Sequence, residues 1–322
     1  MGPTLGELGE RGFIAELRRA VPHGNLMGDD SAVIPPLACP VVTTDSFFEG
    51  RHFHRWWAPP EVLGRRLLEA TVSDLAAMGA EPAWLLAAVS LEPSMELDWL
   101  LAFYRGLASR RGTVIAGGET VRGPGFGLTL TAIGEGTEPG TLLRRSALRP
   151  GDRLWTGGPV GRSLDAPKYL EECGGLTGKD LDPVRDAVTA ERLEQLRAFL
   201  TPSAQVELGQ RLREEGVECA IDISDGLFSE ARHLGEESGL DVVLKIDGSV
   251  FLPSVRERPL EAAAAGEDFL LLFGADEGRD FRDMGCLPVG RAEEGGTGML
   301  TVILNGTEVP VRTIGYDHME VD

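Results

Sequence analysis

Cysteine, cationic side chains and long apolar runs are all scarce in this chain of 322 residues. The cysteines, Cys39, Cys173, Cys219 and Cys286, are widely spaced and form no CxxC pair, which argues against a disulfide framework or a thiolate zinc site. Lys and Arg number 31 against 51 Asp and Glu, a formal net charge of −20. Because nucleic acids and anionic membranes bind basic faces, we expect no nucleic-acid partner and no membrane partner.

Apolar targeting and membrane-spanning patterns are also missing from the sequence. No run reaches the roughly 18 apolar residues that a transmembrane helix requires, and the opening residues MGPTLGELGERGF lack an apolar signal core. We therefore expect a cytoplasmic protein. With 42% hydrophobic and 25% charged residues, the composition is that of a globular chain long enough for two domains.

Strand and helix patterns alternate along both halves of the chain. WLLAAVSL is typical of a buried strand, LDWLLAFYRGLASRRG of an amphipathic helix, and TVILNGTEVPV of a hairpin that turns at Asn305-Gly306. The polar segment from Gly136 to Asp152 is typical of a crossing between domains. The sequence predicts an α/β fold with mixed sheets, in which an N-terminal α/β domain spans 1–140 and a C-terminal α/β domain spans 141–322.

Oxygen-bearing side chains lie beside short apolar runs at three places. In VVTTDSFFEGRHF, Val41 and Val42 are typical of the end of a buried strand, which predicts that the next residues lie at its mouth. GDDSAVI and CAIDISDGL carry similar acidic groups. The candidate residues in these three stretches are Asp30, Thr43, Thr44, Asp45, Asp222, Ser224 and Asp225.

Electrostatics indicates what a site shared by these residues would hold. Two like unit charges about 4 Å apart repel by roughly 4 kcal/mol at an effective dielectric constant near 20, so converging carboxylates need cations. Oxygen ligands without Cys or His are those that Mg²⁺ prefers, and Mg²⁺ is usually shared with a substrate phosphate. The alternative, for any single aspartate, is an ordinary turn former or helix cap.

Asp74 lies in a predicted helix that Pro59 and Pro60 begin and Gly79 ends. Helical spacing places it on one face with Thr71, Leu75 and Met78, a stripe that is otherwise small or apolar. A buried carboxylate is costly unless it is paired or binds a metal ion. The alternative is an aspartate at the edge of the apolar face, bonded to a nearby amide or arginine.

Further candidates are weaker when taken singly. TVIAGGET predicts a strand that ends at Gly117, Gly118 and Glu119, where the backbone can approach a phosphate closely. Arg145 follows Arg144, and an arginine beside carboxylates offers bidentate phosphate contacts; the alternative is a solvated charge in a linker.

Three aromatic side chains also have ordinary structural interpretations. Tyr104 has the helical spacing of a core residue. His52 and His54 lie two apart on an apparent strand and would share a face, but no third nitrogen or sulfur ligand suggests zinc.

Taken together, six ordered motifs resemble the thiamine-monophosphate kinase family, within the superfamily that includes aminoimidazole ribonucleotide synthetase. They are GDDSAV, TTDSFFEGRHF, VSDLAAMGAEP, RRSALRPGD, AIDISDGL and GEDFLLLF. The resemblance implies transfer of the γ-phosphoryl group of ATP onto thiamine monophosphate, giving thiamine diphosphate. It also implies a two-domain fold, a homodimer in which N-terminal sheets associate, and an active site in a cleft.

The resemblance assigns expected roles to individual residues. Those expected to hold Mg²⁺ are Asp30, Thr43, Thr44, Asp45, Asp74, Asp222 and Asp225. Those expected to contact ATP are Tyr104, Gly118, Glu119, Arg145 and Ser224. His52, Glu267 and Tyr316 are expected to contact the thiamine phosphate, and Asp225 and Arg145 are the residues expected to be catalytic.

The acceptor phosphate is already anionic, so positioning and charge neutralisation suffice and direct in-line transfer without a phosphoenzyme is expected. This requires carboxylates from both halves of the chain to meet. The sequence departs from the family pattern at Glu119, Ala265, Phe269 and Leu270. Two alternatives stay open: another ATP-using enzyme of the superfamily, resembling aminoimidazole ribonucleotide synthetase, and a non-catalytic dimeric nucleotide-binding scaffold.

Overall fold

The structure is a computed structural model that describes residues 2–185, 188–311 and 315. Contacts divide the chain into two compact units. Unit 1 comprises residues 1–75, 81–136 and 170–187, and unit 2 comprises residues 76–80, 137–169 and 188–322. The chain thus passes between the units several times, because short segments of each half belong to the other unit. The mixed α/β class predicted from the sequence is confirmed.

Unit 1 is built on a four-stranded mixed sheet with the strand order β1-β4-β2-β3. Its strands are β1 (Pro40–Phe48), β4 (Gly127–Glu135), β2 (Glu81–Leu91) and β3 (Val114–Arg122). β4 pairs antiparallel with both β1 and β2, whereas β2 and β3 are parallel. The other regular elements that lie wholly in this unit are α1 (Leu5–Ala20), η1 (Gly24–Gly28), α3 (Leu97–Leu107), β6 (Leu176–Thr177) and β7 (Asp182–Pro183).

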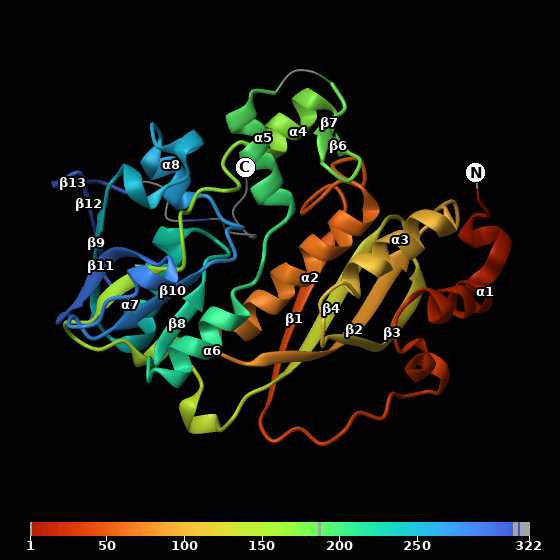
Figure 1. The fold of residues 1–322 in the computed structure, drawn as a ribbon, viewed down its shortest axis with the longest axis horizontal. Helices are drawn as coiled ribbons and strands as arrows, with labels where there is room; N and C mark the ends of the chain where they lie inside the picture. The colour runs from red at the N-terminus through yellow and green to blue at the C-terminus, as the bar shows by residue number, and fades with distance from the viewer. Residues whose placement is uncertain (1, 186–187, 312–314, 316–322) are drawn as a thin grey trace. The chain divides into compact units, whose positions relative to one another are not determined.

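One face of this sheet is covered and the other is open. Figure 1 shows helices α2 (Pro60–Ala77) and α3 lying across the sheet. Alternate residues such as Leu128, Leu130 and Ala132 of β4 are buried, as expected for a strand with one face against helices. The opposite face exposes large apolar side chains, including Val42 at 62% and Phe48 at 54%.

Unit 2 contains, among the described residues, a seven-stranded mixed sheet with the order β13-β12-β9-β11-β5-β10-β8. Its strands are β5 (Arg153–Thr156), β8 (Cys219–Asp222), β9 (Asp241–Ile246), β10 (Leu271–Ala275), β11 (Leu287–Glu293), β12 (Leu300–Leu304) and β13 (Thr307–Val309). The predicted hairpin is confirmed, because β12 and β13 pair and Asn305 and Gly306 both have positive φ, as a tight hairpin turn requires.

The core of unit 2 forms where α7 (Leu227–Ser238) packs on one face of this sheet. Leu227, Phe228 and Leu234 of the helix are buried in one cluster with Leu244 of β9 and Leu272 of β10. The remaining helices are α4 (Ala166–Cys173), which spans the boundary at residue 169, α5 (Ala190–Leu200), α6 (Val206–Glu214) and α8 (Pro259–Ala264). Short 3₁₀ turns are η2 (Pro139–Thr141), η3 (Arg145–Ala147), η4 (Gly248–Val250), η5 (Pro253–Val255) and η6 (Arg282–Met284).

Candidate functional site

Unit 1 brings together Asp45 on β1 and Asp74 on α2. Side chains along β1 alternate between the sheet faces, and Thr43 and Asp45 point to the face that the helices cover. The Thr43 hydroxyl donates a hydrogen bond of 2.5 Å to the Asp74 carboxylate. Asp74 therefore faces the sheet, as its helical spacing predicts, and its observed partner is a hydroxyl.

The two carboxylates are close enough to disturb each other. The pKa of Asp45 is raised to about 6, first by burial and second by the charge of Asp74, while a hydrogen bond from Thr71 opposes the shift. The charge of Asp74 thus makes ionisation of Asp45 less favourable. A cation bound between them would remove this penalty.

The donor set at this pair suits Mg²⁺. It consists of two carboxylates and the Thr43 hydroxyl, all hard oxygen ligands. Among the described residues, no three Asp, Glu, His or Cys side chains come together as a metal cage. Mg²⁺ commonly binds one or two carboxylates and takes its other ligands from water and phosphate, so the pair fits the predicted ion.

The predicted position of these residues on β1 is wrong. Thr43, Thr44 and Asp45 lie in the middle of a nine-residue strand and not at its mouth. Because the side chains alternate, Thr44 points to the opposite face, where its hydroxyl bonds the Leu130 carbonyl and the Thr131 hydroxyl, both at 3.1 Å. The structure therefore separates the Thr44 side chain from Asp45 and Asp74, and its role as a ligand stays a prediction.

Two other predicted strand ends are also wrong. Asp30 is exposed and follows the 3₁₀ turn η1, in a stretch without strand structure. Gly118 and Glu119 lie inside β3, which continues to Arg122. A Cβ at Gly118 would lie 1.8 Å from the Ala87 carbonyl oxygen, so this glycine permits close pairing with β2. Contacts of Gly118 and Glu119 with ATP stay a prediction.

The aromatic candidates of unit 1 have clear structural surroundings. Tyr104 is 2% exposed and packs with Phe13 and Phe103, and burial raises the pKa of its hydroxyl. This favours the core interpretation. His52 and His54 are not on a strand: both lie in the loop that follows β1. His52 Nδ1 accepts the Phe48 N–H at 3.0 Å, and His54 stacks on Trp56.

Unit 2 holds the second acidic group. Asp222 is the last residue of β8 and is buried, so this predicted strand end is confirmed. Ser224 and Asp225 follow in the short loop before α7. The Glu267 N–H donates to the Ser224 carbonyl at 2.6 Å, which brings this predicted substrate residue beside the loop.

Glycine permits this close approach of two backbones. A Cβ at Gly266 would lie 2.3 Å from the Ser224 carbonyl oxygen, and one at Gly226, whose φ is +116°, would lie 2.8 Å from the Ala264 carbonyl oxygen. No other residue fits either position without a shift of the backbone. The AIDISDG and AGEDF stretches are therefore locked together.

Asp268 is a buried residue that the sequence assigned to no role. It is 1% exposed, and its carboxylate accepts backbone N–H groups of Gly161 at 2.9 Å and Arg162 at 2.7 Å. Burial raises its pKa to about 6, while these hydrogen bonds and the Arg162 charge oppose the shift. Asp268 thus ties the glycine-rich turn after β5 to the segment that carries Glu267. The sequence signal that could have identified Asp268 is its place directly after Gly266-Glu267 in the GEDF motif.

Glu230 was also missed by the sequence reasoning. Its carboxylate contacts Ser224, the Asp225 N–H and His233. The hydrogen bond with Glu230 is the largest cause of a raised pKa at His233, whereas the nearby charge of Arg145 lowers it. Arg145 is exposed at the start of η3, and its carbonyl accepts the Ser238 hydroxyl at 3.1 Å. Arg145, Ser224 and Asp225 therefore belong to one neighbourhood of unit 2.

Two departures from the family pattern are explained by packing. Phe269 and Leu270 are buried, and Leu270 belongs to the unit 2 core. Ala265 follows the last residue of α8 with extended backbone, which does not require glycine. Tyr316, expected to contact the thiamine phosphate, lies outside the described residues.

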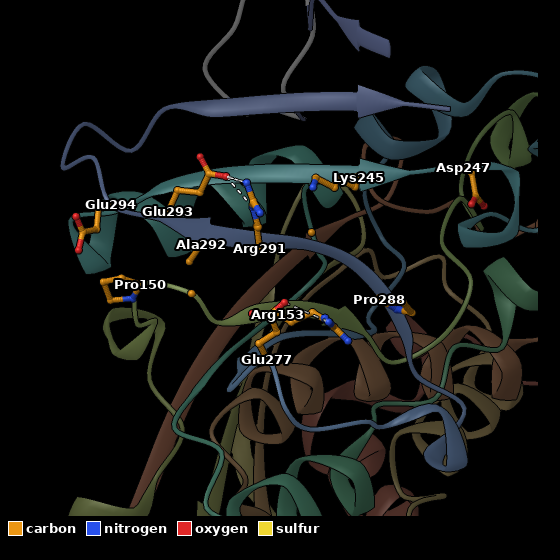
Figure 2. A pocket seen from close by; sticks show the side chains of 12 residues that line it. Pro150, Arg153, Lys245, Asp247, Glu277, Pro288, Arg291, Ala292, Glu293 and Glu294 are labelled. Atoms are coloured by element: carbon orange, nitrogen blue, oxygen red, sulfur yellow. Dashed lines mark hydrogen bonds and ion pairs between the residues drawn. The ribbon is translucent and has the colours of Figure 1, made fainter. Parts of the chain in front are cut away.

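The large hollow of unit 2 does not coincide with these groups. It has a volume of about 740 Å³ and, as Figure 2 shows, lies over β5, β9 and β11. Arg153, Lys245 and Arg291 line it together with Asp247, Glu277, Glu293 and Glu294. The lining therefore carries more carboxylates than cations and is unsuited to a polyphosphate.

The chain is similar to a family model, to curated relatives and to solved structures. Residues 28–136 match the family described as AIR synthase related protein, N-terminal domain. The chain is 31% identical over 317 residues to thiamine-monophosphate kinase of Corynebacterium glutamicum, covering 91% of this chain and 90% of the relative. It is 32% identical over 317 residues to thiamine-monophosphate kinase of Escherichia coli K12, covering 91% of each. The crystal structure of thiamine-monophosphate kinase from Stenotrophomonas maltophilia superposes with a TM-score of 0.75 at 28% identity, covering 94% of this chain and 98% of that one.

Proposed function

The chain belongs to the thiamine-monophosphate kinase family, and from this premise we propose that it transfers the γ-phosphoryl group of ATP to thiamine monophosphate, forming thiamine diphosphate. The observation that carries the proposal is the Asp45–Asp74 pair, whose mutual repulsion and oxygen-only donors call for a divalent cation. A cation bound by this pair would reduce the negative charge of the phosphates of ATP and thiamine monophosphate.

Asp45 and Asp74 of unit 1, and Asp222 and Asp225 of unit 2, are the residues that would hold Mg²⁺. Bound Mg²⁺ supplies charge neutralisation for the phosphates of both reactants. The proposal also includes ligand roles for Asp30, Thr43 and Thr44. It includes ATP contacts by Tyr104, Gly118, Glu119, Arg145 and Ser224. Arg145 offers a guanidinium for bidentate contact with a phosphate, and His52, Glu267 and Tyr316 would contact the thiamine phosphate.

The proposed reaction is a direct in-line transfer. A phosphate oxygen of thiamine monophosphate forms a bond to the γ-phosphorus as the bond to the β–γ bridging oxygen breaks, and ADP leaves with that electron pair. The acceptor oxygen is anionic, so the chain needs to position both phosphates and exclude water and does not need a strong base. The phosphoryl group passes to the acceptor without a covalent bond to the protein, and phosphoenzyme trapped after brief exposure to labelled ATP would contradict this step.

We also propose that a second copy of the chain covers the open face of the unit 1 sheet. Val42, Phe48, Leu86 and Val121 expose apolar side chains there, and such a patch commonly marks a protein interface. Val42→Lys and Val121→Lys should shift the sedimentation of the protein toward the monomer. Arg19→Ala, an exposed change on α1, is the control.

We propose the cytoplasm as the location of the protein. The four cysteines are free and buried, which suits a reducing compartment. In the part of the chain that the structure describes, no helix has the length and apolarity to cross a membrane.

Release of ADP in the presence of ATP, Mg²⁺ and thiamine monophosphate tests the proposed activity. We expect turnover that depends on all three, with thiamine diphosphate as the product. ATP binding without turnover would instead support the non-catalytic scaffold.

A further inference from the structure

The Glu230 side chain lies one turn into α7 and is 2% exposed. Its Oε1 accepts the Asp225 N–H at 3.0 Å and faces the Ser224 hydroxyl at 3.5 Å. Its Oε2 lies 3.1 Å from Nδ1 of His233, one turn further along the helix. A buried carboxylate is costly unless hydrogen bonds compensate its lost hydration, and Glu230 directs most of its hydrogen-bonding capacity at the loop between β8 and α7.

This loop is fixed from two sides. On the other side, the Ser224 carbonyl accepts the Glu267 N–H at 2.6 Å, and Gly266 leaves no space for a side chain against the Ser224 carbonyl oxygen. Glu230 supplies the restraint from the helix side. Together these contacts restrain the Asp225 backbone, which limits where its carboxylate can lie before any ligand binds.

The contact with Asp225 resembles a capping interaction. A glutamate in the first turn of a helix commonly reaches back to a backbone N–H that the helix leaves without an internal partner. Here that N–H belongs to a residue expected to bind metal. The hydrogen bond from the Asp225 N–H to Glu230 therefore ties the loop to the first turn of α7 and restrains a candidate ligand.

We propose that Glu230 is a positioning residue, which holds Ser224 and Asp225 in the geometry needed for metal binding and touches neither reactant. This inference rests on the proposed function, because it takes Asp225 as a ligand. Outer partners of metal ligands typically change metal affinity 10- to 100-fold when they are lost.

The test is Mn²⁺ binding to the whole protein, followed by the electron paramagnetic resonance signal of free Mn²⁺, in Glu230→Met, Glu230→Gln and Asp225→Asn. Met preserves the length of the side chain but cannot accept the Asp225 N–H, whereas Gln still can. We expect Glu230→Met to weaken the same Mn²⁺ site as Asp225→Asn, by about tenfold or more, and Glu230→Gln to stay within about threefold of wild type. Glu237→Ala, an exposed change on the same helix, should bind Mn²⁺ as wild type does.

The outcomes separate this inference from the proposed function. If Asp225→Asn weakens Mn²⁺ binding while Glu230→Met does not, Glu230 is not a positioning residue. Glu230→Gln is isosteric with wild type and keeps an acceptor for the Asp225 N–H. If it loses Mn²⁺ binding as Asp225→Asn does, the hydrogen bond is not what holds the site and the inference is overturned. This outcome can be read even where Glu230→Met fails to fold. Unchanged Mn²⁺ binding in Asp225→Asn would contradict the proposed ligand itself.

Discussion

In unit 1, Asp45 and Asp74 are held by regular secondary structure, whereas in unit 2, Asp225 lies in a loop held by backbone and side-chain hydrogen bonds. The first pair meets because a strand face and a helix face pack together. The second group depends on close backbone contacts at glycines and on the buried carboxylate of Glu230, which accepts an N–H of the loop. We infer that metal-ligand changes in unit 1 affect mainly charge, while changes around the loop in unit 2 affect mainly geometry.

The largest effect is expected from Asp45→Asn. This change removes a proposed Mg²⁺ ligand and the repulsion with Asp74, so turnover should fall about a hundredfold or more while the metal-free protein becomes more stable. Kinetics and thermal melting in a chelator measure the two effects. Asp98→Asn, an exposed change in the same unit, should alter neither. Loss of both activity and stability in Asp45→Asn would indicate a structural role.

The charge at this pair also predicts a pH dependence. The folded pKa of Asp45, about 6, lies above its ordinary value of 3.8, so between these pH values the folded state binds more protons than the unfolded state. Stability of the metal-free protein should therefore fall as pH rises from about 4 to 6, by up to about 3 kcal/mol. Denaturant titrations in a chelator measure it. This decline in stability should be absent from Asp45→Asn, and Mg²⁺ should reduce it in wild type. If the stability of the variant falls equally between about pH 4 and 6, other titrating groups cause the decline.

Gly266→Ala tests the geometric side of the comparison. The added Cβ would lie 2.3 Å from the Ser224 carbonyl oxygen, so the loop must move, at a cost of about 2 kcal/mol or more. We expect a lower melting temperature together with weaker binding of thiamine monophosphate. Gly140→Ala, which has no atom within 4 Å of the new Cβ, is the control. A stable, fully active Gly266→Ala would show that the loop tolerates displacement.

A smaller effect is expected from paired changes on β1. Thr43→Val removes the hydroxyl that bonds Asp74 and should raise the Mg²⁺ concentration for half-maximal activity severalfold, because a hydrogen bond of this kind is worth about 1 kcal/mol. Thr44→Val acts on the open face and should leave that concentration within about twofold. Mg²⁺ titrations of both variants decide between the faces. A larger effect at Thr44 would show that its side chain, and not only that of Thr43, takes part in Mg²⁺ binding.

The sequence was informative where periodicity carried the signal. Local patterns predicted the hairpin at Asn305-Gly306 and the end of a helix at Gly79, which has a positive φ. They also predicted the face of that helix on which Asp74 lies, and this face is directed at the sheet. Strand limits were less accurate, because β1 and β3 continue through polar residues that look like strand ends. Pairing with neighbouring strands, which local patterns do not reveal, extends them.

The residues missed by sequence reasoning act through the tertiary fold. Glu230 and Asp268 contact backbone N–H groups, and Asp268 does so with a turn 106 residues away in the chain. Neither spacing nor hydrophobicity marks such a residue, since any surface carboxylate would have the same pattern. His52 and His54 were predicted to lie on a strand, but Gly50 turns the chain with a φ of +85°.

The central claim is Mg²⁺-dependent phosphoryl transfer at the Asp45–Asp74 pair. The most direct measurement is thiamine diphosphate formation from thiamine monophosphate and ATP across a Mg²⁺ titration, in wild type and Asp74→Asn. We predict saturable, Mg²⁺-dependent product formation by wild type and product near background in Asp74→Asn, with the variant still folded. Product formation at the wild-type rate in Asp74→Asn, or in wild type with all divalent cations chelated, would contradict the claim.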